Sequence, residues 1–246
     1  MIGLGTIING GAILAGGFIG LLAGRFLKEG IQKIISLAIG LSVLSMSISG
    51  IVANMLIKVN GSYQSRGTYV IIFSLVLGGI LGEIIDIDGN LEKFGEWLKK
   101  KSGSQNDAAF VNAFVSASLT VCIGAMAVVG SIMDGTKGDY SILLTKSIMD
   151  FVIIIALTAS NGKGSIFSAI PVVIFQGSIT LFSRLLLPLL TDTAMNNLSL
   201  VGSVLILCVG INIIADGKFK IKLANLLPAL IFAIAAAFIP LKFFSM

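Results

Sequence analysis

The chain contains no histidine, and this removes the residue most often used as a general base or metal ligand. Its two cysteines, Cys122 and Cys208, stand far apart with no C-x-x-C spacing, so neither a disulfide nor a metal site is predicted. Nucleotide-binding loops, H-E-x-x-H motifs and paired-aspartate protease motifs do not occur. We therefore expect no enzyme activity, no metal and no cofactor.

Charged residues are also scarce. Asp, Glu, Lys and Arg make up 12% of the 246 residues, whereas soluble domains contain about 25%. Hydrophobic residues make up 56%, and the mean hydropathy is +1.02. Because lipid leaves no backbone polar group unpaired, long apolar runs must form helices. The sequence predicts an all-α, polytopic transmembrane helix bundle, a single domain over 1–246 with the lipid bilayer as its partner.

Eight apolar runs are long enough to be candidate membrane spans: 4–24, 34–57, 68–85, 108–132, 141–160, 164–187, 198–215 and 223–245. The net charge of +5 comes from basic residues in the short loops between them, so it indicates topology and not nucleic-acid binding. Arg25, Lys28, Lys33 and the lysines of 93–101 fall on one side, which the positive-inside rule assigns to the cytoplasm. Both termini are then predicted outside.

The longest polar segment, 86–107, lies between the third and fourth runs, on the predicted cytoplasmic side. Within it, Leu91, Phe94 and Leu98 recur at helical spacing in the stretch 89–101, beside Trp97 and several lysines. This pattern is typical of an amphipathic helix that lies on the membrane surface. A helix that binds a partner is the alternative.

Small residues repeat every four positions in two of the runs: Ala12, Gly16, Gly20 and Gly24 in the first, and Ala229, Ala233 and Ala237 in the last. Such stripes let helices pack closely in lipid. They fit either another span of the same chain or a second protomer, and we expect a homodimer.

The first and sixth runs align at a constant offset of 159 residues, which matches Gly5 with Gly164 and Arg25 with Arg184. The offset also sets the polar interruption 9–11 against 168–171. Because four runs separate the two, they cross the bilayer in opposite directions. Three-span units at the two ends would then form an inverted repeat around a central helical hairpin, as in secondary transporters. Chance agreement in a biased composition is the alternative.

Polar side chains at membrane depth are candidates for a hydrophilic path. Asn9 lies in the interruption of the first run, and Gln176 follows Pro171 in the sixth. Ser45 and Ser49 share one face of the second run at i,i+4 spacing. A proline kink and hydrogen bonds between helices would explain the same residues without a path.

The hairpin at 130–150 places Lys146 and Asp150 inside the fifth run. Each charge costs about 2.5 to 3.5 kcal/mol at the centre of a membrane helix. They are four residues apart and share a face, so they can neutralise each other, and Lys146 could extend towards the surface. Either they border a passage for an ion or solute, or they hold the bundle together.

Asp134 and Asp139 lie on the turn of this hairpin, next to Gly135 and Gly138. Helix capping and turn formation would account for both carboxylates. A vestibule that attracts cations, or a gate, is the functional interpretation.

Four motifs together resemble the YdfK/YqgA-type family of bacterial inner-membrane proteins: GSIMDGxxGDxS at 130–141, KSxxD at 146–150, PVVIFQG at 171–177 and ANLLPAL at 224–230. The resemblance covers the whole chain from GTIIN at 5–9. It implies a multi-pass protein of the bacterial inner membrane. It supplies no established binding or catalytic residue.

Taken together, these patterns predict a transport protein for a small hydrophilic solute or ion, coupled to protons or cations. An ion channel, or a membrane scaffold or sensor that does not transport, are the alternatives. The residues expected to line the path are Lys146, Asp150, Asp134, Asp139, Gln176, Asn9, Ser45 and Ser49.

Overall fold

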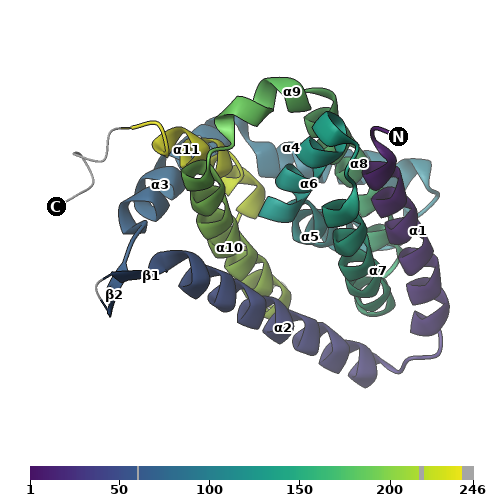
Figure 1. Cartoon of the computed structure of the whole chain (residues 1–246). Coiled ribbons are helices and arrows are strands. Elements are labelled where there is room, and N and C mark those ends of the chain that lie inside the picture. The colour runs from purple at the N-terminus through teal and green to yellow at the C-terminus, as the bar shows by residue number, and fades with distance from the viewer. Residues whose placement is uncertain (60, 216–218, 240–246) are drawn as a thin grey trace.

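The computed structural model describes residues 1–59, 61–215 and 219–239, and helices form nearly all of it (Figure 1). The α-helices are α1 (Leu4–Gly24), α2 (Glu29–Met55), α3 (Thr68–Ile85), α4 (Ile87–Lys101), α5 (Phe110–Cys122), α6 (Ala125–Lys137), α7 (Ser141–Asn161), α8 (Ala169–Leu181), α9 (Ser183–Leu186), α10 (Asp192–Ala215) and α11 (Ala229–Ala236). Short 3₁₀ helices are η1 (Lys163–Ser168), η2 (Leu187–Leu189) and η3 (Leu223–Leu226). A small antiparallel hairpin, β1 (Leu56–Val59) with β2 (Ser62–Ser65), joins α2 to α3.

Six segments among the described residues are long and apolar enough to cross a membrane: α1, α2, α3, α7, α10 and η1 together with α8. The predicted all-α membrane bundle is therefore confirmed, but two of the eight expected spans take another form. The run at 108–132 is not one helix, because α5 and α6 meet at an angle of 62°. The last run forms only a short apolar segment, Leu223–Ala236, and its expected end at 245 lies outside the described residues.

The two polar interruptions of the sequence, 9–11 and 168–171, have different outcomes, because only the second coincides with a change in helix type, from η1 to α8 after Ser168. α1 runs without a break through Asn9, Gly10 and Gly11, because a helix tolerates these residues when neighbouring helices pack against them. Pro171 lies in the first turn of α8, where proline is tolerated, so it does not kink that helix.

The helices of the first unit pack on their counterparts in the last unit, and each pair is antiparallel. In α1 and η1–α8, Gly10 meets Val173 and Gly17 meets Ile166. Between α2 and α10, Gly40 contacts Ile214 and Gly50 contacts Ser203. Between α3 and the last helices, Gly78 contacts Ala229 of α11 and Gly82 contacts Asn225 of η3. The offset of 159 residues places 29–55 over most of α10 as well. An inverted repeat would give this arrangement, and the repeat itself stays a prediction.

Two groups of helices pack densely within themselves and less densely on each other. We call α1, α5, α6, α7 and η1–α8 the α1 body, and α2, α3, α10, η3 and α11 the α10 body. Figure 1 shows the α1 body on the right and α3, α10 and α11 on the left, with α2 running beneath. Contacts between the bodies run mainly from α2 to α7 and from α10 to α5 and α6, while α4 touches both α5 and η3.

The small-residue stripes are used inside the chain. A Cβ atom at Gly16, Gly20 or Gly24 would lie 2.6, 2.5 or 2.9 Å from a carbonyl oxygen of α7, so α1 lies directly on the α7 backbone. Ala229 and Ala233 are fully buried, and Ala229 packs on Gly78 of α3. The homodimer prediction therefore loses the observation on which it rested.

The amphipathic helix expected at 89–101 is α4, and its apolar side packs against the protein itself. Leu98 is buried in the main hydrophobic cluster, Leu91 and Phe94 pack against that cluster, and Gly95 touches Phe114 of α5. Trp97 remains exposed. The apolar stripe thus fixes α4 to α5, and its position at a membrane surface stays a prediction.

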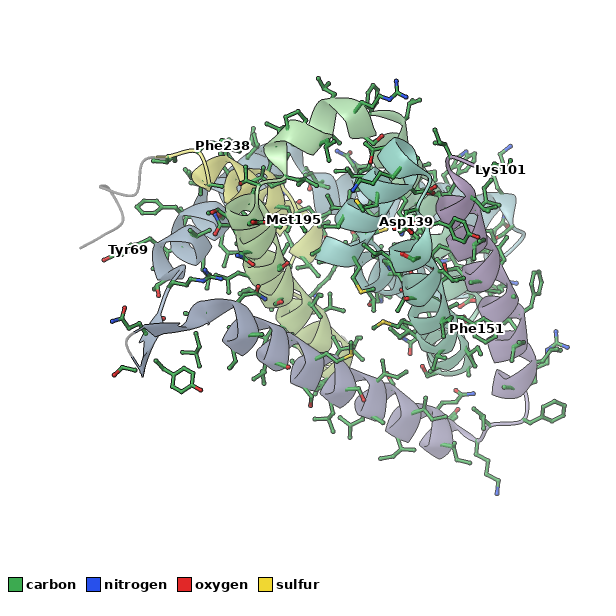
Figure 2. The ribbon with its side chains drawn as sticks, viewed as in Figure 1. Tyr69, Lys101, Asp139, Phe151, Met195 and Phe238 are labelled. Atoms are coloured by element: carbon green, nitrogen blue, oxygen red, sulfur yellow. The ribbon has the colours of Figure 1, made fainter. Side chains whose placement is uncertain are left out.

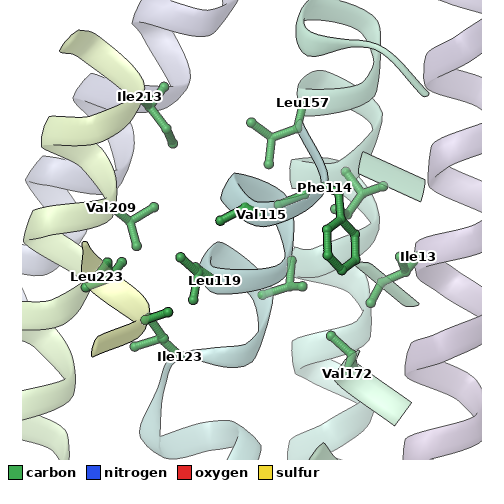
Figure 3. Close-up of a cluster of buried hydrophobic side chains, with 14 of the residues drawn as sticks. Ile13, Phe114, Val115, Leu119, Ile123, Leu157, Val172, Val209, Ile213 and Leu223 are labelled. Atoms are coloured by element: carbon green, nitrogen blue, oxygen red, sulfur yellow. The ribbon is translucent and has the colours of Figure 1, made fainter. Parts of the chain in front are cut away.

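The main hydrophobic cluster lies where the two bodies meet (Figure 3). Phe114, Leu119 and Leu157 come from the α1 body, and Val209 and Leu223 come from the α10 body. In Figure 3 the side chain of Leu119 extends from α5 towards Val209 and Leu223. An apolar seam of this kind holds the bodies together without fixed polar contacts.

Candidate functional site

Lys146 and Asp150 form a buried ion pair on α7. Their exposed fractions are 6% and 4%, and Lys146 Nζ lies 2.5 Å from Asp150 Oδ2. The same ammonium donates to the backbone carbonyl of Val121 at 2.6 Å. Asn9 Nδ2 of α1 donates to Asp150 Oδ2 at 3.0 Å. The pair therefore joins three helices, α1, α5 and α7.

The break between α5 and α6 supplies the carbonyl that Lys146 binds. Val121 lies in the last turn of α5, where carbonyls have no partner within the helix and attract positive charge. Gly124 follows with φ +150°, a conformation that only glycine adopts readily, so the chain can change direction there. Broken helices of this kind form ligand sites in secondary transporters.

The ion pair is sealed in this conformation. Lys146 does not extend to the surface as expected, because Asp150 and the end of α5 provide it with buried partners. Neither residue lines either of the two main cavities found among the described residues. In this state the pair is buried between α1, α5 and α7 and borders neither cavity.

A polar cavity of about 420 Å³ lies between the two bodies. Asn112 and Ser116 of α5 and Asn161 of α7 face it from the α1 body, and Asn212 of α10 faces it from the other side. Ser36, Ser160, Phe219, Lys220 and several apolar residues complete the lining, including Leu119 at the level of the apolar seam. None of these residues was predicted from the sequence, although Asn112 and Ser116 stand at i,i+4 in an apolar run and could have been found by that spacing.

A second cavity of about 490 Å³ is almost wholly apolar. It lies between the bent α5–α6 pair, α8, α10 and α11, and its lining includes Pro171, Phe175, Leu198 and Leu227. Leu119 lines both cavities and is only 5% exposed. This side chain therefore separates the polar space from the apolar one.

Ion pairs connect the edge of the polar cavity to α4, and a hydrogen bond connects η3 to α3. Lys220, which lines the cavity, binds Asp88 at 2.7 Å and Glu92 at 2.5 Å. Asn225 of η3 donates to Glu83 at 2.6 Å and accepts from the Asp88 amide at 2.7 Å. The lysine charge is thus neutralised, and the other polar groups of this mixed lining are amides and hydroxyls.

Asp134 and Asp139 are close in sequence but have different environments. Asp134 is fully buried and accepts hydrogen bonds from the amides of Gly3 and Gly5 at 3.2 and 3.0 Å, so it caps α1. Asp139 is exposed and accepts from Ser141 at the start of α7, and these hydrogen bonds hold the pKa of Asp139 below its ordinary value. Both fit the capping interpretation, and neither lines the polar cavity.

The remaining predicted path residues divide into two groups. Gln176 is fully buried on α8, and neither atom of its amide has a hydrogen-bond partner within the described residues. Ser45 and Ser49 lie on α2, outside both cavities, and Ser45 donates back to the Leu41 carbonyl at 2.9 Å. Because such a bond satisfies a hydroxyl within its own helix, this serine can face lipid.

Phe151 shows how closely the two long helices of the α1 body pack. Its ring, labelled in Figure 2, projects from α7 beside α1, and its carbonyl lies against Gly16. Asn9 and Asp150 meet along the same α1–α7 contact. This packing keeps the ion pair out of reach of solvent.

Comparisons with known proteins agree with this architecture. A family model described as "Protein of unknown function (DUF554)" matches residues 4–238. The uncharacterized membrane protein YdfK of Bacillus subtilis (strain 168) is 32% identical over 228 residues, which cover 92% of each chain. The uncharacterized protein YqgA of Escherichia coli (strain K12) is 27% identical over 234 residues, or 94% of each. No solved structure matches the chain.

Proposed function

Since the chain belongs to the DUF554 family and is a multi-pass membrane protein, we propose that it transports a small polar solute by alternating access. The observation that carries this proposal is the polar cavity between two helix bodies that stops at Leu119. We place the protein in a bacterial inner membrane with both termini outside, so that the cavity opens towards the cytoplasm.

The predicted inverted repeat supports a mechanism. Each body contains both members of its antiparallel pairs, as it would if a half-turn about one axis related its two ends. A cavity at one end implies an equivalent arrangement at the other when the bodies tilt. In secondary transporters such rocking exposes one site alternately to the two sides of the membrane.

The cavity chemistry supports the class of solute. Asn112 and Ser116 can donate and accept hydrogen bonds. Asn212 already uses both atoms of its amide on the Ile221 backbone, and Lys220 is neutralised by Asp88 and Glu92. A lining of this kind suits a small polar solute with little net charge. The Lys146–Asp150 pair would close the passage beyond the cavity, and its rearrangement would accompany opening.

Uptake of a solute mixture by reconstituted vesicles tests the proposal even while the solute is unidentified. Proteoliposomes containing the full chain are incubated with a mixture of small polar metabolites, and their contents are analysed by mass spectrometry. At least one solute should accumulate above protein-free vesicles, with saturation and exchange. Ser116→Phe should abolish uptake by filling the cavity, whereas Ser45→Phe, on the outer face of α2, should retain it.

Three outcomes would contradict the proposal. If folded, reconstituted protein moves no solute of the mixture, or if Ser116→Phe transports normally, the cavity is not the route. Flux that never saturates and shows no exchange would instead identify a channel.

A further inference from the structure

Eight buried side chains in the α1 body carry oxygens that have no hydrogen-bond partner within the described residues, and five of them lie on α1, α6 and α8. These five are Thr6, Asn9, Ser131, Gln176 and Thr180, and each is at most 6% exposed. Polar atoms buried in this way normally bind water, an ion or a ligand.

The packing of α1 on α8 brings two of these side chains to one level. Gly10 lies against Val173 in this antiparallel pair. One turn back along α1 is Thr6, and one turn forward along α8 is Gln176. Because i and i+4 share a helix face, the unpartnered hydroxyl of Thr6 and the unpartnered amide of Gln176 lie along the same α1–α8 contact.

The packing of α6 on α8 adds the third helix. Gly135 lies against the Thr180 carbonyl and Ser183, and both helices end beside the amino terminus of α1, so they run parallel. One turn before Gly135 is Ser131, and one turn before Thr180 is Gln176. Asp134 faces α1 and Gly135 faces α8. Ser131 lies three and four residues before them, so around the helix axis its side chain is between theirs and its hydroxyl is directed at the seam between α1 and α8.

Asn9 links this layer of oxygens to the ion pair. Its Nδ2 donates to Asp150 Oδ2, while its Oδ1 is among the unpartnered atoms. Asp150 is therefore the carboxylate next to the layer, and Lys146 is its present counter-charge.

We infer that these oxygens form a binding site for an alkali metal cation, which would couple its gradient to the transport proposed above and so rests on that function. Hard cations prefer carboxylate, amide and hydroxyl oxygens. A divalent ion is disfavoured because one already neutralised carboxylate is present, and the described residues hold no cluster of three acidic, cysteine or histidine ligands.

The site also suggests how a cation acts on the broken helix. The metal cation and Lys146 are alternative positive partners of Asp150. When the cation enters, Lys146 is less strongly held, and its hydrogen bond to Val121 at the end of α5 weakens. Cation binding in the α1 body therefore favours release of the contact that keeps α5, α6 and α7 together.

Thermal unfolding of the purified full chain in detergent tests the site without any measurement of flux. NaCl and KCl are titrated against choline chloride at constant ionic strength. The apparent melting temperature should rise and saturate with Na⁺ or K⁺ but not with choline. Gln176→Leu should abolish this response without lowering the cation-free melting temperature, since it replaces an unpartnered amide with an apolar group of similar size.

Thr158→Val is the matched control. Thr158 is also buried with an unpartnered hydroxyl, but it packs against Gly20, far along α7 from Asp150, so the cation response should persist. If Gln176→Leu does not fold, Thr6→Val removes one ligand with no change of shape, and it should raise the half-saturating cation concentration at least tenfold.

The inference would be overturned if Na⁺ and K⁺ did not change the melting temperature, or if Gln176→Leu and the wild type showed the same change. The oxygens would then be sites for water only. Vesicle uptake is measured separately. Solute uptake without cation binding would contradict the cation site and leave the transport function standing. Cation binding without any solute uptake would support the site and contradict the transport function.

Discussion

At the scale of single residues, Lys146 and Asp150 depend on each other because both are buried in a membrane helix. Removal of one partner leaves an uncompensated charge, which typically costs about 3 to 5 kcal/mol, whereas replacement of both with apolar residues is often neutral. We expect Lys146→Met and Asp150→Leu to lower the free energy of unfolding strongly as single variants. The double variant should recover most of that loss.

Unfolding by denaturing detergent in mixed micelles measures these three variants. Their losses would simply add if the two charges acted independently. An additive result would therefore show that the pair does not hold α7 to α5.

The Asp134 carboxylate is a second residue whose role can be tested alone. It accepts the amides of Gly3 and Gly5, and loss of an N-terminal cap costs about 0.5 to 2 kcal/mol. Asp134→Ala should destabilise the protein by at least this amount and accelerate amide exchange in the first turn of α1. Asp139→Ala, at the exposed turn, should leave that exchange unchanged; equal exchange in both variants would argue against the cap.

At the scale of elements, the α1–α7 contact depends on the absence of side chains. A Cβ atom at Gly20 would lie 2.5 Å from the Ile155 carbonyl oxygen, so Gly20→Ala must push the helices apart. Overpacking of this kind costs typically about 1 to 3 kcal/mol. Gly11→Ala is the control, since a Cβ atom there meets nothing within 4 Å and alanine favours the helix. Comparison of their thermal stabilities tests the contact, and equal stabilities would refute it.

The α5–α6 break depends on a single backbone conformation. Gly124 has φ +150°, where an L-residue is strained by about 1 to 3 kcal/mol. Gly124→Ala should destabilise the break, while Gly30→Ala, in open space at the start of α2, should have little effect. A stability assay with both variants checks this, and a wild-type melting temperature for Gly124→Ala would mean that the bend tolerates side chains.

At the scale of the whole molecule, the polar cavity should be accessible from one side of the membrane only. In a background with Cys122→Ala and Cys208→Ala, we expect Ser116→Cys and Asn212→Cys to react with a membrane-impermeant maleimide from the side that carries Lys99–Lys101. Ser131→Cys, which is fully buried, should not react from either side. Labelling of Ser116→Cys from the opposite side would reverse the proposed topology.

The amino-acid sequence predicts much of the architecture. Composition predicted the membrane bundle, and the offset of 159 residues predicted which helices of the two ends pack on each other in antiparallel pairs, because helix length, hydropathy and the parity of crossings are properties of the chain itself. The i,i+4 spacing of Lys146 and Asp150 likewise predicted that they can meet.

The tertiary structure decided what those residues contact. The carbonyl of Val121, the bend at Gly124 and the cavity lined by Asn112 and Asn212 depend on which helices are neighbours, and hydropathy carries no such information. For the same reason the glycine stripe of α1, which fits any close partner, was assigned to α7 only by packing. The sequence by itself determined which polar and charged side chains must be kept out of lipid. Only the packed helices decided which groups pair with them, because the partners of a buried charge come largely from segments far away in the chain.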